Sequence, residues 1–92
     1  MRICILDGAQ IYDRGRLHDI LASSLELPEW YGRNLDALYD CLTDADQETE
    51  VRILHKDALY ENLGGYGPAL ERVLRQAAES NSYFHWRVVD SL

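Results

Sequence analysis

The chain has 92 residues, a length typical of one small domain, and we expect residues 1–92 to form a single domain. It is 47% hydrophobic and 27% charged, a balance that supports a buried core and excludes a disordered tail. No apolar run approaches the roughly 18 residues that span a bilayer, and the N-terminal apolar stretch is too short for a signal peptide. We therefore expect a cytoplasmic protein without membrane contact.

The charge is distributed unevenly along the chain. Sixteen acidic and nine basic residues give a net charge of −7. Seven of the acids lie in residues 29–50 against a single arginine, so this segment carries −6 and the rest of the chain only −1. Nucleic-acid binding requires the opposite sign, because affinity comes from cations against phosphate. The sequence therefore predicts a basic partner and no nucleic acid.

The first half of the chain predicts one strand and two helices. Residues 2–6 form an apolar run with β-branched side chains, which predicts a buried strand. Asp13 is suited to cap a first helix that Pro28 closes, and Asn34 is suited to cap a second. The inward-facing positions of the two helices are Leu17, Ile20, Leu21 and Leu25 in the first, and Leu35, Leu38 and Leu42 in the second.

The second half predicts two more strands separated by helical segments. Residues 51–54 form a short strand, and a helical turn follows through Leu59 and Tyr60. The glycine-rich segment 64–67 ends that turn and starts another helix, with Pro68 in its first turn. The inner face of this helix contains Leu70, Val73, Leu74, Ala77 and Ala78, and a third strand alternates through Phe84, Trp86 and Val88.

Strands joined through helices cannot pair by tight hairpins. The economical arrangement is a parallel sheet with right-handed crossover connections. We therefore predict an α/β fold with a small three-stranded parallel sheet and packed helices.

Three carboxylates recur at four-residue intervals in the second predicted helix. Asp36, Asp40 and Asp44 fall on one helical face, opposite the leucine stripe, and should face solvent. A solvated acidic face is the plain interpretation of such a row. Aromatic residues change that interpretation, because large aromatic side chains beside repelling charges favour a covered surface. These aromatics are Trp30, Tyr31 and Tyr39.

Catalytic and metal-binding interpretations are weaker. The carboxylates share one exposed face, whereas an acid–base pair needs two different environments. The three histidines lie on separate elements and are expected at the surface or at strand edges; they are His18, His55 and His85. Cys4 and Cys41 are expected to be reduced core residues. We predict neither a metal nor a cofactor, although a spatial catalytic triad stays open at this level.

Two segments resemble a known family. Residues 27–43 read Leu-Pro-Glu-Trp-Tyr-Gly-Arg-Asn-Leu-Asp-Ala-Leu-Tyr-Asp-Cys-Leu-Thr. They resemble the central motif of the barstar family, the intracellular inhibitors of the bacterial ribonuclease barnase. Residues 5–11, Ile-Leu-Asp-Gly-Ala-Gln-Ile, resemble the first strand and turn of that family. The resemblance extends more loosely to the helix from Pro68 and to the closing strand, and it implies the same parallel sheet with packed helices.

The resemblance also implies a mechanism for the acidic row. The carboxylate matching Asp40 takes the place of an RNA phosphate among the cations of the nuclease, because its two oxygens accept bidentate bonds from arginine. Asp36 matches a second interface acid, and Trp30 matches an aromatic residue that packs over catalytic groups. The residues expected to contact the partner are Trp30, Tyr31, Asn34, Asp36, Tyr39, Asp40, Thr43, Asp44 and Gln76.

Three positions depart from the best-known member of the family. Arg33 stands in place of an acid, Gln76 in place of a glutamate, and Asp44 is an additional acid. These departures predict a partner that differs from barnase at the rim of the contact surface, around the central contacts. The sequence thus favours a non-enzymatic inhibitor of a basic, extracellular-type ribonuclease. The alternative is an acidic adaptor of the same fold that binds a basic partner other than a nuclease.

Overall fold

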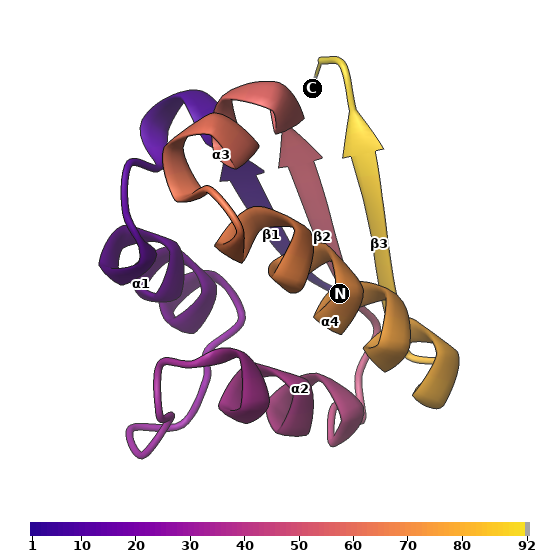
Figure 1. Ribbon diagram of the computed structural model, residues 1–92. Coiled ribbons are helices and arrows are strands. Elements are labelled where there is room, and N and C mark those ends of the chain that lie inside the picture. Colours follow the sequence, from indigo (N-terminus) through magenta and orange to yellow (C-terminus); the bar gives the residue numbers. More distant parts are fainter. Residues whose placement is uncertain (92) are drawn as a thin grey trace.

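The computed structural model describes residues 1–91 and shows one three-stranded sheet with four α-helices (Figure 1). The elements in chain order are β1 (Arg2–Asp7), the 3-10 turn η1 (Gly8–Gln10), α1 (Arg14–Ser24), α2 (Leu35–Thr43), β2 (Thr49–Leu54), α3 (Lys56–Leu63), α4 (Tyr66–Ser80) and β3 (Phe84–Val89).

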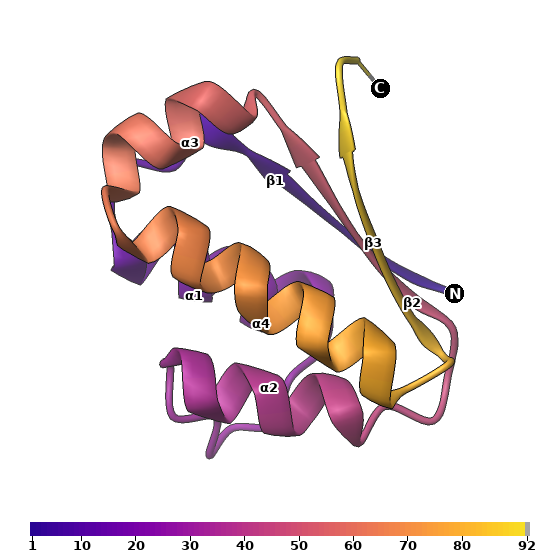
Figure 2. The same ribbon diagram turned by 45° about the vertical axis from the view of Figure 1, so that its right-hand side comes forward.

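The sheet has the order β1-β2-β3, and both strand pairs are parallel. Cys4 pairs with Val51, which in turn pairs with Trp86. All four helices lie on one side of the sheet, and α2 packs against α4 (Figure 2). The predicted α/β architecture with a parallel sheet is therefore confirmed. Within residues 1–91, no helix is long and apolar enough to cross a membrane.

The predicted helix starts are confirmed by their capping bonds. The Asp13 side chain accepts a bond from the Arg16 N–H at 2.8 Å, and the Asn34 side chain accepts one from the Ala37 N–H at 2.8 Å. Such bonds satisfy N–H groups that have no partner inside the helix. The helical turn expected near Leu59 is longer than predicted, since it forms the whole of α3.

The core lies between the sheet and the helices. Along β1, Cys4 and Leu6 point into it and are fully buried. Ile3 and Ile5 point to the opposite face and remain 39% and 37% exposed, because successive side chains of a strand alternate between faces. The prediction of a buried first strand is therefore wrong for Ile3 and Ile5, since no described helix covers that face (Figure 2).

Gly8 marks a close approach between two backbone segments. It is buried at the end of β1, and a Cβ atom built there would lie 2.2 Å from the carbonyl oxygen of His55 and 2.6 Å from the nitrogen of Leu59. The Asn62 side chain also donates to the Gly8 carbonyl at 3.1 Å. Only glycine leaves room for α3 to pack this closely on the η1 turn.

Candidate functional site

The acidic face of α2 is exposed as predicted. Asp36, Asp40 and Asp44 all lie in solvent, while Leu38 and Leu42 on the opposite side are buried in the core. Within residues 1–91, none of the three carboxylates forms an ion pair. Like charges four residues apart repel by a few tenths of a kcal/mol. The face is thus a row of unneutralised charges on a rigid helix.

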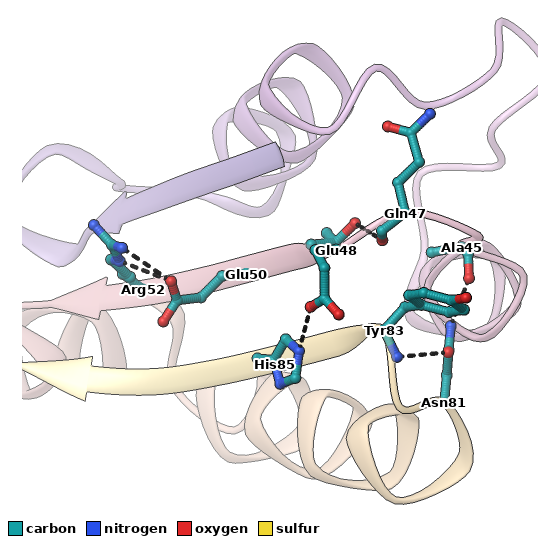
Figure 3. Close-up of polar contacts among 9 residues, drawn as sticks. Ala45, Gln47, Glu48, Glu50, Arg52, Asn81, Tyr83 and His85 are labelled. Carbon is teal, nitrogen blue, oxygen red and sulfur yellow. Dashed lines mark hydrogen bonds and ion pairs between the residues drawn. The ribbon is translucent and has the colours of Figure 1, made fainter. Parts of the chain in front are cut away.

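Two acids of the segment, Glu50 in β2 and Glu48 just before it, do not belong to this face. Figure 3 shows Glu50 on β2 and Glu48 at the start of that strand; Glu48 lies 2.6 Å from the His85 ring and Glu50 lies 2.9 Å from Arg52. Glu50 also forms a second ion pair, with Arg87 at 2.9 Å. The acidic segment read from the sequence therefore divides. The acids of the segment that form no ion pair within residues 1–91 are Glu29, Asp36, Asp40, Asp44 and Asp46.

Trp30 and Tyr31 have opposite environments in the segment before α2. Trp30 is 80% exposed, whereas Tyr31 is 7% exposed and belongs to the core. The expectation that both aromatics lie on the surface is wrong for Tyr31, because its ring fills the space beside α1. A buried residue next in sequence fixes the backbone at Trp30, so that a large aromatic side chain is presented to solvent at a defined place.

His18 is buried, and the prediction of a surface histidine is wrong at this position. Its ring nitrogens lie 2.5 Å from the Tyr31 hydroxyl and 2.7 Å from the Tyr66 hydroxyl. A neutral imidazole has one N–H and one acceptor nitrogen. One tyrosine therefore donates to the ring and the other accepts from it. His55 and His85 are exposed, as expected.

The burial of His18 predicts a stability that falls in mild acid. Burial, with a contribution from the Arg33 charge, lowers the pKa of His18 below its usual 6.5. As the pH falls, His18 therefore becomes protonated at a higher pH in the unfolded chain than in the folded one. The free energy of unfolding is greatest above about pH 6.5 and declines as the pH falls below that value. Urea unfolding at pH 7.5 and 5.5 measures the decline.

A His18→Gln variant provides the comparison. It should lose stability at pH 7.5 but show a smaller further loss between pH 7.5 and 5.5 than the parent. If both proteins lost the same free energy of unfolding between pH 7.5 and 5.5, His18 would not be the cause of the acid sensitivity.

Arg33 anchors the same segment from its other end. Its guanidinium lies 2.6 Å from the Asp19 carboxylate and donates to the Gly15 carbonyl at 3.0 Å. Arg33 has a φ of 55°, a left-handed conformation that costs energy for a residue with a side chain. Contacts of this kind hold the strained turn in place. The connection between α1 and α2 is therefore attached to α1 on both sides of Gly32.

The remaining predicted contact residues lie around the C-terminal half of α2. Tyr39 is half-buried against α4, and its hydroxyl is 3.1 Å from the Ser80 hydroxyl. Gln76 is exposed one helical turn before Ser80, so it borders the same junction. Thr43 donates its hydroxyl to the carbonyls of Tyr39 and Asp40, at 2.9 and 3.1 Å. Tyr39 and Gln76 thus extend the surface of α2 onto α4.

The two cysteines differ, which corrects the prediction that both are core residues. Cys4 is buried, and burial raises its pKa to about 11. Cys41 is half-buried and lines a cavity beside Trp30; burial and the charges of Asp40 and Asp44 raise its pKa.

These environments predict different thiol reactivities. Cys41 should react first with a disulfide reagent in the native state, and Cys4 only on unfolding, because a thiol needs both access and ionisation to react. Labelling rates of the parent and of a Cys41→Ser variant measure this order. A fast phase that persists in Cys41→Ser would show that Cys4 is accessible.

Two comparisons with known proteins agree with this geometry. The family model described as Barstar (barnase inhibitor) matches residues 1–89. A Bacillus subtilis (strain 168) protein named "Putative ribonuclease inhibitor YrdF" is 38% identical over 81 residues, which cover 86% of this chain and 88% of that protein.

The fold and the exposed acidic helix define a small α/β binding protein. The family match over nearly the whole chain makes the assignment specific: the chain belongs to the barstar family. The family and the relative point to an inhibitor rather than to an enzyme.

Proposed function

We propose that this protein inhibits a basic ribonuclease of the barnase type by covering its active site with the exposed face of α2. The observation that carries the proposal is the unneutralised row of Asp36, Asp40 and Asp44 beside the exposed Trp30. A ribonuclease active site binds phosphate with cationic groups, so a rigid row of carboxylates is complementary to it.

Each residue has a separate part in the proposed interface. Asp40, at the middle of the row, takes the position of a substrate phosphate, and Asp36 pairs with a neighbouring cation. Trp30 packs its exposed ring over the rim of the active site, as aromatic anchors do in other interfaces. Asn34 acts indirectly, since its side chain caps α2 and thereby orients both acids. The outer contacts come from Tyr39, Thr43, Asp44 and Gln76.

Tyr31 has a different part from the one that the sequence suggested. Its hydroxyl and ring are buried against His18, so we assign it to holding the segment before α2 rather than to contact with the nuclease. The proposed site of action is the cytoplasm, where an inhibitor would protect a cell from a ribonuclease made for export.

An inhibition titration tests the proposal. Purified protein is added to a set of small basic ribonucleases, including barnase, and cleavage of a fluorogenic RNA is followed. We expect stoichiometric inhibition of at least one barnase-type enzyme and competition with RNA-like mononucleotides for the active site. Binding without competition, or no inhibition of any barnase-type enzyme, would contradict active-site coverage.

Association with the nuclease should depend strongly on salt. The acids of α2 attract a basic active site over long distances, and salt screens this field with a Debye length of about 10 Å at 0.1 M. We expect the association rate to fall about tenfold or more between 20 and 500 mM NaCl, within the range known for electrostatic steering. Stopped-flow fluorescence measures the rate.

Two charge variants make the steering test specific. Asp36→Asn removes a charge from the proposed interface, whereas Glu48→Gln removes one just before β2, where it faces His85 (Figure 3). The first should slow association more than the second. If both variants slowed association equally, the attraction would come from the net charge of the protein and not from the acids of α2.

A further inference from the structure

A cavity of about 240 Å³ lies at the C-terminal end of α2, beside the proposed contact face. Its apolar lining includes Leu25 and Leu42, which are buried, and the side chains of Leu27 and Pro28. Trp30 stands at its edge with 80% of its surface in solvent. The cavity is open on one side and is therefore accessible to a side chain from outside.

The charged residues of this cavity are mostly acidic. Glu26, Asp44 and Asp46 line it, against Arg2 as the one base among its lining residues. Arg2 is already paired with Glu26 at 3.2 Å. Asp44 and Asp46 therefore keep their charges uncompensated, within residues 1–91, at the border of an apolar space.

We propose that this cavity receives one arginine or lysine side chain from the rim of the partner ribonuclease. This inference rests on the proposed function, since that function supplies a basic protein partner. The apolar lining covers the aliphatic stem of such a side chain, while Asp44 and Asp46 accept its charged head group. The face of an exposed tryptophan adds a cation–π contact of a kind that favours arginine.

The cavity gives this chain a means of selecting its partner. Asp40 recognises groups that every nuclease of this kind needs for catalysis. A side chain entering beside Ala45 would come from the rim, which is free to differ between nucleases. The cavity is therefore a specificity site, and its occupant adds to the contacts made by α2.

A titration with small probes tests the cavity without any nuclease. N-acetyl-arginine amide is added to labelled protein, and NMR shifts of the Trp30 indole and the Ala45 amide are followed. N-acetyl-citrulline amide, a neutral isostere, is the matched probe, and N-acetyl-norleucine amide tests for an apolar occupant. We expect saturable shifts with millimolar affinity for arginine and at least tenfold weaker binding of citrulline.

Two variants locate the binding. Ala45→Leu fills the cavity and should abolish the shifts, whereas Ala58→Leu makes the same change in a different cavity and should preserve them. Asp44→Asn, an isosteric change at an exposed position, should weaken arginine binding several-fold even if Ala45→Leu fails to fold. Equal binding of arginine and citrulline, tighter binding of norleucine, or indifference to Asp44→Asn would overturn the proposal.

The nuclease assay then separates the two proposals. In a pair that is inhibited, Ala45→Leu should weaken inhibition about tenfold while Ala58→Leu leaves it unchanged. Unchanged inhibition by Ala45→Leu would refute the cavity and leave active-site coverage standing. If no ribonuclease is inhibited, the proposed function fails, and the rim assignment that rests on it fails too, even if the arginine probe binds.

Discussion

Asp40→Ala is expected to weaken inhibition of the target ribonuclease by about 2–8 kcal/mol, the range of strong interface hot spots. The upper end of that range belongs to another complex of the barstar family. The reason for a large effect is the position of Asp40, exposed at mid-helix between Asp36 and Asp44. In the complex the cations of the nuclease would relieve this repulsion, and without Asp40 they would be buried without a partner.

The folded state should tolerate this change. Within the described residues, the Asp40 carboxylate makes no ion pair, and the bonds from Thr43 and Asp44 go to its backbone carbonyl, which alanine retains. Stability should therefore stay the same or rise by a few tenths of a kcal/mol. Inhibition constants and urea midpoints are measured together, with Asp57→Ala on α3 as the control. A folded Asp40→Ala that inhibits like the parent would eliminate the phosphate-mimic mechanism.

Gly8→Ala is expected to be strongly destabilising, by about 3 kcal/mol or more, at the top of the usual range for overpacking. The added methyl group would meet the carbonyl of His55 at 2.2 Å and the nitrogen of Leu59 at 2.6 Å. These are backbone atoms, which cannot avoid the clash by changing rotamer as a side chain could. Helix α3 would therefore have to move away from the η1 turn. For a domain of this size the melting temperature should fall by roughly 12–24 °C.

Gly65→Ala is the matched control. Gly65 has a φ of −59°, which any residue adopts, and a Cβ there meets no atom within 4 Å. This variant should melt at or slightly above the parent temperature, because alanine reduces the freedom of the unfolded chain. Calorimetry of the three proteins measures the difference. If Gly8→Ala had the same melting temperature as Gly65→Ala, the close packing of α3 on η1 would be wrong.

Local signals in the sequence predict most of the fold. Caps such as Asp13 and Asn34 act within three residues, and the helix at residues 66–80 has an apolar stripe that periodicity reveals. The acidic row of α2 was predictable for the same reason, since its spacing and the opposing leucines determine which side faces solvent.

Other features depend on contacts between distant segments. His18 lies three residues before Leu21 and seven before Leu25, so helical spacing places it on the inner face. What the sequence does not reveal is how a polar ring is accommodated there, because its partners Tyr31 and Tyr66 are 13 and 48 residues away. The same contact removes Tyr31 from the surface. The charge of residues 29–50 misrepresents Glu48 and Glu50, because their partners His85 and Arg87 lie on β3, far outside that segment.

The course of β3 has a practical use in binding measurements. This strand leads away from α2 in both views, so that the end of the described chain and helix α2 lie on opposite sides of the molecule (Figures 1 and 2). A tether attached to a sensor chip after residue 91 would leave the acids and Trp30 directed toward the flowing nuclease. Immobilisation through surface amines at random would instead involve Lys56, the one lysine of the sequence, and the N-terminus.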